Sequence, residues 1–139
     1  LTEISLPSSL KSIGSICFNN CISLKKIVIP PSVDTINDGA FDGCSSLEEI
    51  SLSISLKLIS SSCFRYCSLL REIDIPPSVT AIGDYAFIYC SSLKKLTIPS
   101  SVTSIGRNII HECSKSIKVI NHSNVNYMTG KIKQKCAIC

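Results

Sequence analysis

The sequence predicts a repeat solenoid of about six units, each 23 residues long. Five cysteines recur with this period, at Cys21, Cys44, Cys67, Cys90 and Cys113. Six further columns, filled mostly by Leu, Ile, Val and Phe, keep the same spacing through at least five repeats. Fixed self-similarity with a period in the twenties is typical of solenoids, in which each unit stacks only on its neighbours. Six such units account for residues 1–138 of the 139-residue chain.

Each unit is expected to begin with a strand. In the segment 24–29, Ile27 and Ile29 point to one side while Lys26 and Val28 point to the other, which is the period-two alternation of a β-strand. Pro30 and Pro31 follow at once, and proline ends a ladder because it has no N–H to donate.

The rest of each unit is expected to return to the core through turns. The segment 78–83 sends Val79 and Ile82 back to the interior. Glycine shares one column at positions 14, 83 and 106, which predicts a turn that favours positive φ, although Asn37 and Ser60 fill the same column in other units. The segment 85–90 is predicted to form one short helical or 3₁₀ turn.

The unit that runs from Cys90 to Gly106 (CSSLKKLTIPSSVTSIG) resembles the 23-residue leucine-rich repeats of BspA-like proteins. The resemblance covers residues 1 to about 128. It implies a right-handed leucine-rich-repeat arc with a parallel β-sheet on its concave face and a mostly irregular, turn-rich convex side. It also implies a surface antigen, adhesion or interaction protein without catalytic activity.

The two ends of the repeat array differ. In the last unit Ser116, Asn121 and His122 stand where Leu, Ile and Pro are expected, and such decay is typical of a terminal repeat whose outer face meets water. No comparable change occurs at Leu1, so we expect the array to be truncated at its N-terminal end. The predicted domains are a solenoid over 1–130, with a degenerate last unit, and a basic tail over 131–139.

Seven of the nine cysteines occupy repeat positions. Cys17 and Cys63 share a column with Ala40 and Ala86, which indicates a small buried slot where a free thiol packs as a small hydrophobe. Zinc and disulfides are the alternatives, since Cys17 and Cys21 have C-x₃-C spacing. The next such pair is 46 residues on, two rungs away, so convergent metal ligands are not expected. The sequence predicts packed thiols and no metal site.

The C-terminal tail carries a candidate lipidation site. The chain ends in Cys136, two aliphatic residues and Cys139, which looks like a prenylation box with Cys136 as the thioether site. Lys131, Lys133 and Lys135 precede it, and a polybasic stretch is the usual second signal for membrane binding. Cys139 is not typical of the last position of such a box. A frayed end and a C-x-x-C redox or zinc pair are the alternatives.

The solvent-facing strand positions predict a binding face. One column on the expected concave sheet is charged throughout: Glu3, Lys26, Glu49, Glu72, Lys95 and Lys118. The neighbouring column is also expected to face solvent: Thr2, Lys25, Glu48, Arg71, Lys94 and Ile117. Pairs such as Lys26–Glu49 and Glu72–Lys95 are expected across strands. The column is either a plain solvated face or a protein-binding surface. Its mixed signs argue against a nucleic-acid partner, which favours a single-sign stripe.

Composition and motifs narrow the function. An apolar fraction of 45% argues against disorder, no apolar run is long enough to span a bilayer, and no signal peptide is visible. The net charge of +4 falls to +1 over residues 1–130, so the basic excess belongs to the tail. His111 and His122 are the two histidines, and no catalytic pairing, phosphate loop or cofactor site is recognisable.

The sequence therefore predicts a non-enzymatic protein-interaction module, with a protein ligand and no cofactor, tethered to the cytoplasmic face of a membrane through Cys136. The alternative is an extracellular surface antigen or adhesin whose export signal is missing from this fragment. A third reading is a scaffold segment of a larger signalling protein. Prenylation is cytosolic chemistry, so the first two readings exclude each other.

Overall fold

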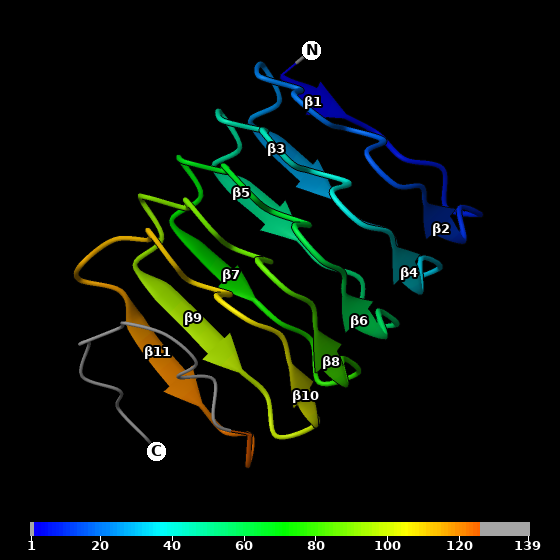
Figure 1. The fold of residues 1–139 in the computed structure, drawn as a ribbon. Coiled ribbons are helices and arrows are strands. Elements are labelled where there is room, and N and C mark those ends of the chain that lie inside the picture. The colour runs from blue at the N-terminus through cyan, green and yellow to red at the C-terminus, as the bar shows by residue number, and fades with distance from the viewer. Residues whose placement is uncertain (1, 126–139) are drawn as a thin grey trace.

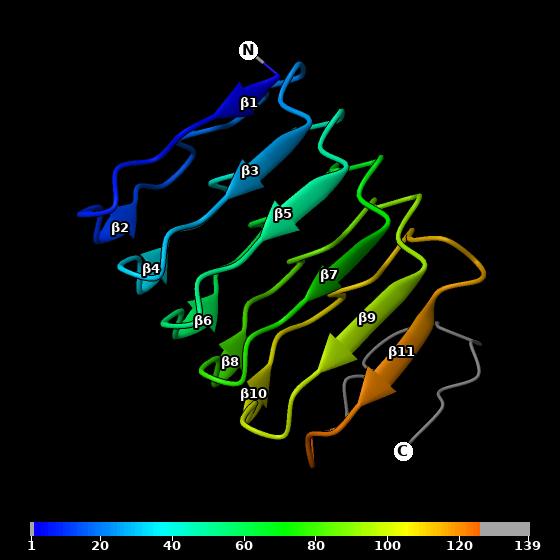
Figure 2. The ribbon, with the colours of Figure 1, turned by 180° about the vertical axis from the view of Figure 1, so that it is seen from behind.

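The computed structural model describes residues 2–125 and shows two rows of parallel strands stacked along one axis (Figures 1 and 2). The first row, here called the long-strand face, consists of β1 (Glu3–Ile4), β3 (Lys26–Val28), β5 (Glu49–Ser51), β7 (Glu72–Asp74), β9 (Lys95–Ile98) and β11 (Lys118–Asn121). The second row, the short-strand face, consists of β2 (Ser12–Ile13), β4 (Thr35–Ile36), β6 (Leu58–Ile59), β8 (Ala81–Ile82) and β10 (Ser104–Ile105).

Every ladder joins residues one repeat apart. Lys26 pairs with Glu3 on one side and with Glu49 on the other, and β8 pairs with both β6 and β10 in the same register. All pairings are parallel, so each turn of the chain adds one rung that runs in the same direction. The predicted 23-residue solenoid with a parallel sheet is confirmed, and the described residues contain no helix.

The return segments form more regular structure than predicted. Residues expected only to turn back to the core form the two-residue strands of the short-strand face. They pair because equal repeat lengths bring each return segment to strand distance from the one below. The segment 85–90, predicted to form one short helical or 3₁₀ turn, contains two separate turns and no helix: the Ile88 N–H donates to the Tyr85 carbonyl and the Cys90 N–H to the Phe87 carbonyl, both at 3.2 Å. Tyr85 and Tyr89 have φ of 58° and 62°, and the left-handed region interrupts a right-handed helix.

The glycine column serves close approach between rungs and not positive φ, so the predicted turn conformation is also wrong. Neither Gly83 nor Gly106 has a positive φ. A Cβ added at Gly83 would lie 2.5 Å from the backbone nitrogen of Ser61 in the preceding rung. The same approach lets the Gly83 N–H donate to the Ile59 carbonyl at 2.7 Å. Ser60, in the same column, instead donates its Oγ hydrogen to the Ile36 carbonyl.

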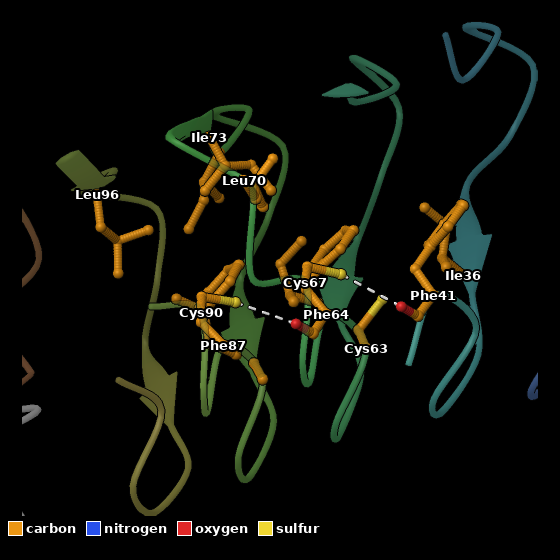
Figure 3. Packing of buried hydrophobic residues seen from close by; sticks show 14 of the residues in the cluster. Ile36, Phe41, Cys63, Phe64, Cys67, Leu70, Ile73, Phe87, Cys90 and Leu96 are labelled. Atoms are coloured by element: carbon orange, nitrogen blue, oxygen red, sulfur yellow. Dashed lines mark hydrogen bonds between the residues drawn. The ribbon is translucent and has the colours of Figure 1, made fainter. Parts of the chain in front are cut away.

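The core lies between the two faces and consists of the repeat columns (Figure 3). Phe41, Phe64 and Phe87 are completely buried, and their rings stack with centroids 5.6 and 5.7 Å apart. Phe18 extends the stack at 5.1 Å. Such stacks follow directly from a fixed period, because the same ring occupies the same place in each rung.

The last repeat adapts to its substitutions. Ser116 stands at the leucine position, and its neighbour Ile117 fills the core instead, with an exposed fraction of 5%. Ile117 was expected among the solvent-facing residues, so the structure corrects that placement. Asn121 occupies an apolar column and is also buried. Its Oδ1 accepts hydrogen bonds from the Ser123 backbone and hydroxyl, and its Nδ2 donates to the Val125 carbonyl at 2.9 Å.

Candidate binding face

The long-strand face carries the predicted charged column on its outer surface. All six side chains are exposed, and consecutive members are ladder partners except Glu49 and Glu72: Glu3, Lys26, Glu49, Glu72, Lys95 and Lys118. Inward-facing neighbours such as Ile27, Ile73 and Leu96 are buried and hold the column in place. The expected position of the column is therefore correct. The strands that carry the column also supply buried side chains to the core.

One of the two expected cross-strand ion pairs is formed on this face. The Lys26 Nζ lies 3.0 Å from a Glu49 carboxylate oxygen. The hydrogen bond and charge of Glu49 raise the pKa of Lys26 above its usual value. Both side chains are more than half exposed, so the pair contributes little to stability. Glu72 and Lys95 are partners in register but form no ion pair within 4.0 Å.

The long-strand face is interrupted between β5 and β7. Strands β1, β3 and β5 form one sheet, and β7, β9 and β11 form another. At the neighbouring steps, Glu48 N–H donates to the Lys25 carbonyl at 2.9 Å and Lys94 N–H donates to the Arg71 carbonyl at 2.8 Å. In the described chain, the equivalent bond from Arg71 N–H to the Glu48 carbonyl is not formed. The ladder is thus open at this one step.

A cleft of about 380 Å³ lies at the interruption, and we call it the β5–β7 cleft. Four carboxylates and one guanidinium line it, together with Ile50 and Ser51. The charged lining residues are Glu48, Glu49, Arg71, Glu72 and Asp74. Glu49 and Glu72 occupy the same column one rung apart, and like charges directly opposite destabilise a strand pair. Lys95 and Lys118 are likewise opposite each other with like charge, and their ladder is formed, so like charge by itself does not open a step of this sheet.

A column of cysteine thiols forms hydrogen bonds between successive rungs. The Sγ–H groups of Cys44, Cys67, Cys90 and Cys113 donate to phenylalanine carbonyls of the preceding rung at 3.0 to 3.3 Å. Burial raises the pKa of Cys44 and of Cys113 to about 12, and burial also holds the pKa of Cys63, Cys67 and Cys90 well above the usual value of a thiol. In the folded chain these groups are therefore packed, protonated thiols.

Cys17 departs from its predicted place. Ala40, Cys63 and Ala86 fill the small buried slot as expected, but Cys17 is exposed. It belongs to the first rung of this sequence, where no rung stacks on that side. All seven described cysteines, including this one, are free thiols.

The turns of the solenoid carry an ion pair and a tyrosine pair that the sequence analysis did not single out. The Arg65 Nη2 lies 2.8 Å from Asp42 Oδ2, and its Nε donates to the same carboxylate. This pairing raises the pKa of Arg65. The Arg65 guanidinium lies over the Tyr66 ring, which stacks on Tyr89 at 4.7 Å. The signal was available in the sequence, since Asp42 and Arg65 are 23 residues apart, as are the two tyrosines.

The remaining features predicted from the sequence concern metal binding, membrane spans and lipidation. Within residues 2–125, no group of three His, Cys, Asp or Glu side chains is arranged to hold a metal ion. The same residues include no helix of the length and apolarity that crossing a bilayer requires. The predicted lipidation site Cys136 and the basic residues Lys131, Lys133 and Lys135 lie outside the described residues.

The repeat geometry has a counterpart among known families. Six copies of the BspA type leucine rich repeat region match residues 1–129. The chain belongs to the BspA-type leucine-rich repeat family. This assignment agrees with the resemblance carried by the Cys90–Gly106 unit. No curated protein matches the chain.

Several solved structures share this BspA-type solenoid. A leucine-rich repeat protein of T. pallidum is 32% identical with a TM-score of 0.82, over 86% of this chain and 58% of that one. A leucine rich cell surface protein of Faecalibacterium prausnitzii is 29% identical with a TM-score of 0.71, over 89% and 40%. The pneumococcal vaccine antigen PcpA is 26% identical with a TM-score of 0.75, over 94% and 32%. The chain thus spans between about a third and three-fifths of these solved chains.

Proposed function

We propose that this BspA-type chain is a protein-interaction module of a cell surface and that it binds a protein ligand through the long-strand face. The observation that carries the proposal is the exposed, charged column held in register above a buried core. A rigid face loses little conformational entropy on binding, and mixed charges select a partner by complementarity. The printed descriptions of two similar proteins, a cell surface protein and a vaccine antigen, support the surface location.

Site-specific photo-crosslinking on intact cells tests this proposal. A photoreactive residue at position 95 lies on the long-strand face, and one at Thr103, also exposed, serves as the matched control beside the short-strand face. We expect protein adducts from position 95, few from position 103, and loss of the adducts when intact cells are treated with protease. Equal adducts from both positions, or adducts that resist external protease, would contradict the proposal.

The lipid tether is a second candidate, favoured by the sequence from Cys136 to Cys139 and the three lysines before it. It predicts an intracellular location instead. Intact mass and membrane fractionation of the wild type and of Cys136→Ser test it. A prenyl mass that the variant lacks, together with loss of membrane association, supports the tether. Equal masses and equal fractionation eliminate it.

A further inference from the structure

The β5–β7 cleft differs in charge from the rest of the molecule. Four carboxylates face it against one guanidinium, whereas the whole chain carries a net charge of +4. Elsewhere on the long-strand face, Lys26 lies between Glu3 and Glu49, and the two last members of the charged column, Lys95 and Lys118, are both basic. A local negative potential within a basic chain attracts cations to this place in particular.

The open ladder adds unpaired backbone groups to the same cleft. At the other steps of this region the carbonyl of one rung accepts an N–H from the next, as the Lys25 carbonyl does from Glu48. Within the described residues, neither the Glu48 carbonyl nor the Arg71 N–H has such a partner. Both residues line the cleft. The carbonyl is an acceptor ready for a donor from outside, because backbone polar groups require partners or water.

The shape and ligand set favour an organic cation over a metal ion. The described residues contain no group of three close carboxylates, histidines or thiols that a divalent ion requires. The cleft volume of about 380 Å³ accommodates a whole side chain. A guanidinium or ammonium carries several N–H donors that reach carboxylates from two strands and a carbonyl at once.

We propose that the β5–β7 cleft binds an Arg or Lys side chain that projects from a partner protein. This inference rests on the proposed interaction function and names the chemistry of the partner: a cationic segment. The four carboxylates attract and orient the cation, and the Glu48 carbonyl accepts one of its hydrogens.

Fluorescence anisotropy with a labelled peptide of four Arg-Ser repeats measures this binding on the full chain. The test variant is Glu72→Gln/Asp74→Asn, which neutralises two carboxylates of β7 that form no ion pair of their own. The matched control is Glu3→Gln/Glu112→Gln, which removes the same charge outside the cleft. Melting curves for all three proteins verify the fold.

We expect the cleft variant to bind the peptide about five- to twentyfold more weakly and the control to stay within about twofold of the wild type. Raising NaCl from 50 to 300 mM is expected to weaken wild-type binding, since exposed charges are screened. Equal weakening in both variants would overturn the proposal, and so would displacement of the peptide by Ca²⁺ at equimolar concentration. Tighter peptide binding after deletion of 131–139 would also overturn it, because the chain's own tail would then be the occupant.

The two proposals fail in different ways. If the peptide does not discriminate between the variants while position 95 still yields surface adducts, the cleft proposal falls and the proposed function stands. If position 95 yields no adducts while the peptide discriminates, the cationic site stands and the surface function falls.

Discussion

The Cys90 thiol lies 3.1 Å from the carbonyl oxygen of Phe64 in the preceding rung (Figure 3). The same carbonyl accepts the backbone N–H of Cys67 at 3.2 Å within its own turn. Both lone pairs of a buried carbonyl are thereby used, one by a turn and one by the next repeat. The bond recurs along the stack, so the cysteine column links neighbouring rungs and does more than fill space.

Removing the Cys90 thiol tests this link. Cys90→Ala leaves the Phe64 carbonyl one partner short and opens a small cavity, so we expect a loss of about 1–3 kcal/mol in unfolding free energy. Cys17→Ala is the matched control, because Cys17 is exposed, and its effect is expected to stay within about 0.5 kcal/mol. Urea denaturation measures both. Equal effects would show that the thiol bond contributes nothing.

Alkaline pH is expected to unfold the solenoid through its thiols. A cysteine in the unfolded chain has a pKa of about 8.5, whereas burial raises the pKa of Cys44 to about 12 in the folded chain. Below pH ~8.5 both states hold the proton. Between that pH and about 12 the unfolded chain loses the proton and the folded chain does not, so stability falls with rising pH. Each buried thiol contributes a slope of about 1.4 kcal/mol per pH unit.

Urea denaturation at pH 8, 9 and 10 measures the slope. Cys44→Ala is expected to reduce it by one thiol's share relative to the wild type, although the variant is less stable at pH 7. An unchanged slope in this variant would mean that Cys44 titrates normally in the folded chain.

Substitutions at two glycines of one column test whether glycine is needed there for close approach between rungs or for its backbone conformation. A methyl group at Gly83 would lie 2.5 Å from the Ser61 backbone nitrogen, so Gly83→Ala is expected to cost about 1–3 kcal/mol. At Gly14 nothing lies within 4 Å of an added Cβ, so Gly14→Ala is expected to be nearly neutral. Thermal melting compares them. Equal destabilisation would indicate that the column is required for its backbone dihedral angles instead.

The glycosylation sequon Asn121-His122-Ser123 is expected to remain unmodified in the folded chain. The Asn121 residue is buried, and its amide nitrogen, to which a glycan would be attached, donates a hydrogen bond to the Val125 carbonyl. Production in a eukaryotic secretory host, followed by intact mass measurement, tests this expectation. A mass gain that disappears in Asn121→Gln would show that the last rung opens in solution. Retention of the unmodified mass supports a closed last rung.

The sequence alone was sufficient for the fold class and for most of the core. The columns of Phe, Leu and Ile repeat with one period, and burial follows from the period because equal loops place equal residues in equal positions. The charged column from Glu3 to Lys118 was located for the same reason. The predictions for Cys17 and Ile117 failed at the two ends of the array, where a residue lacks a neighbour on one side or the repeat has changed.

Only the tertiary structure decided how adjacent rungs meet. Distances between stacked backbones determine three features that the sequence does not reveal. They are the break at the β5–β7 step, the role of Gly83 and the carbonyl that each thiol bonds. A 23-residue period states which residues stack. It does not state whether two backbones come close enough to bond, because that also depends on crowding at each Cβ. The candidate binding site lies at the step where the long-strand ladder is open.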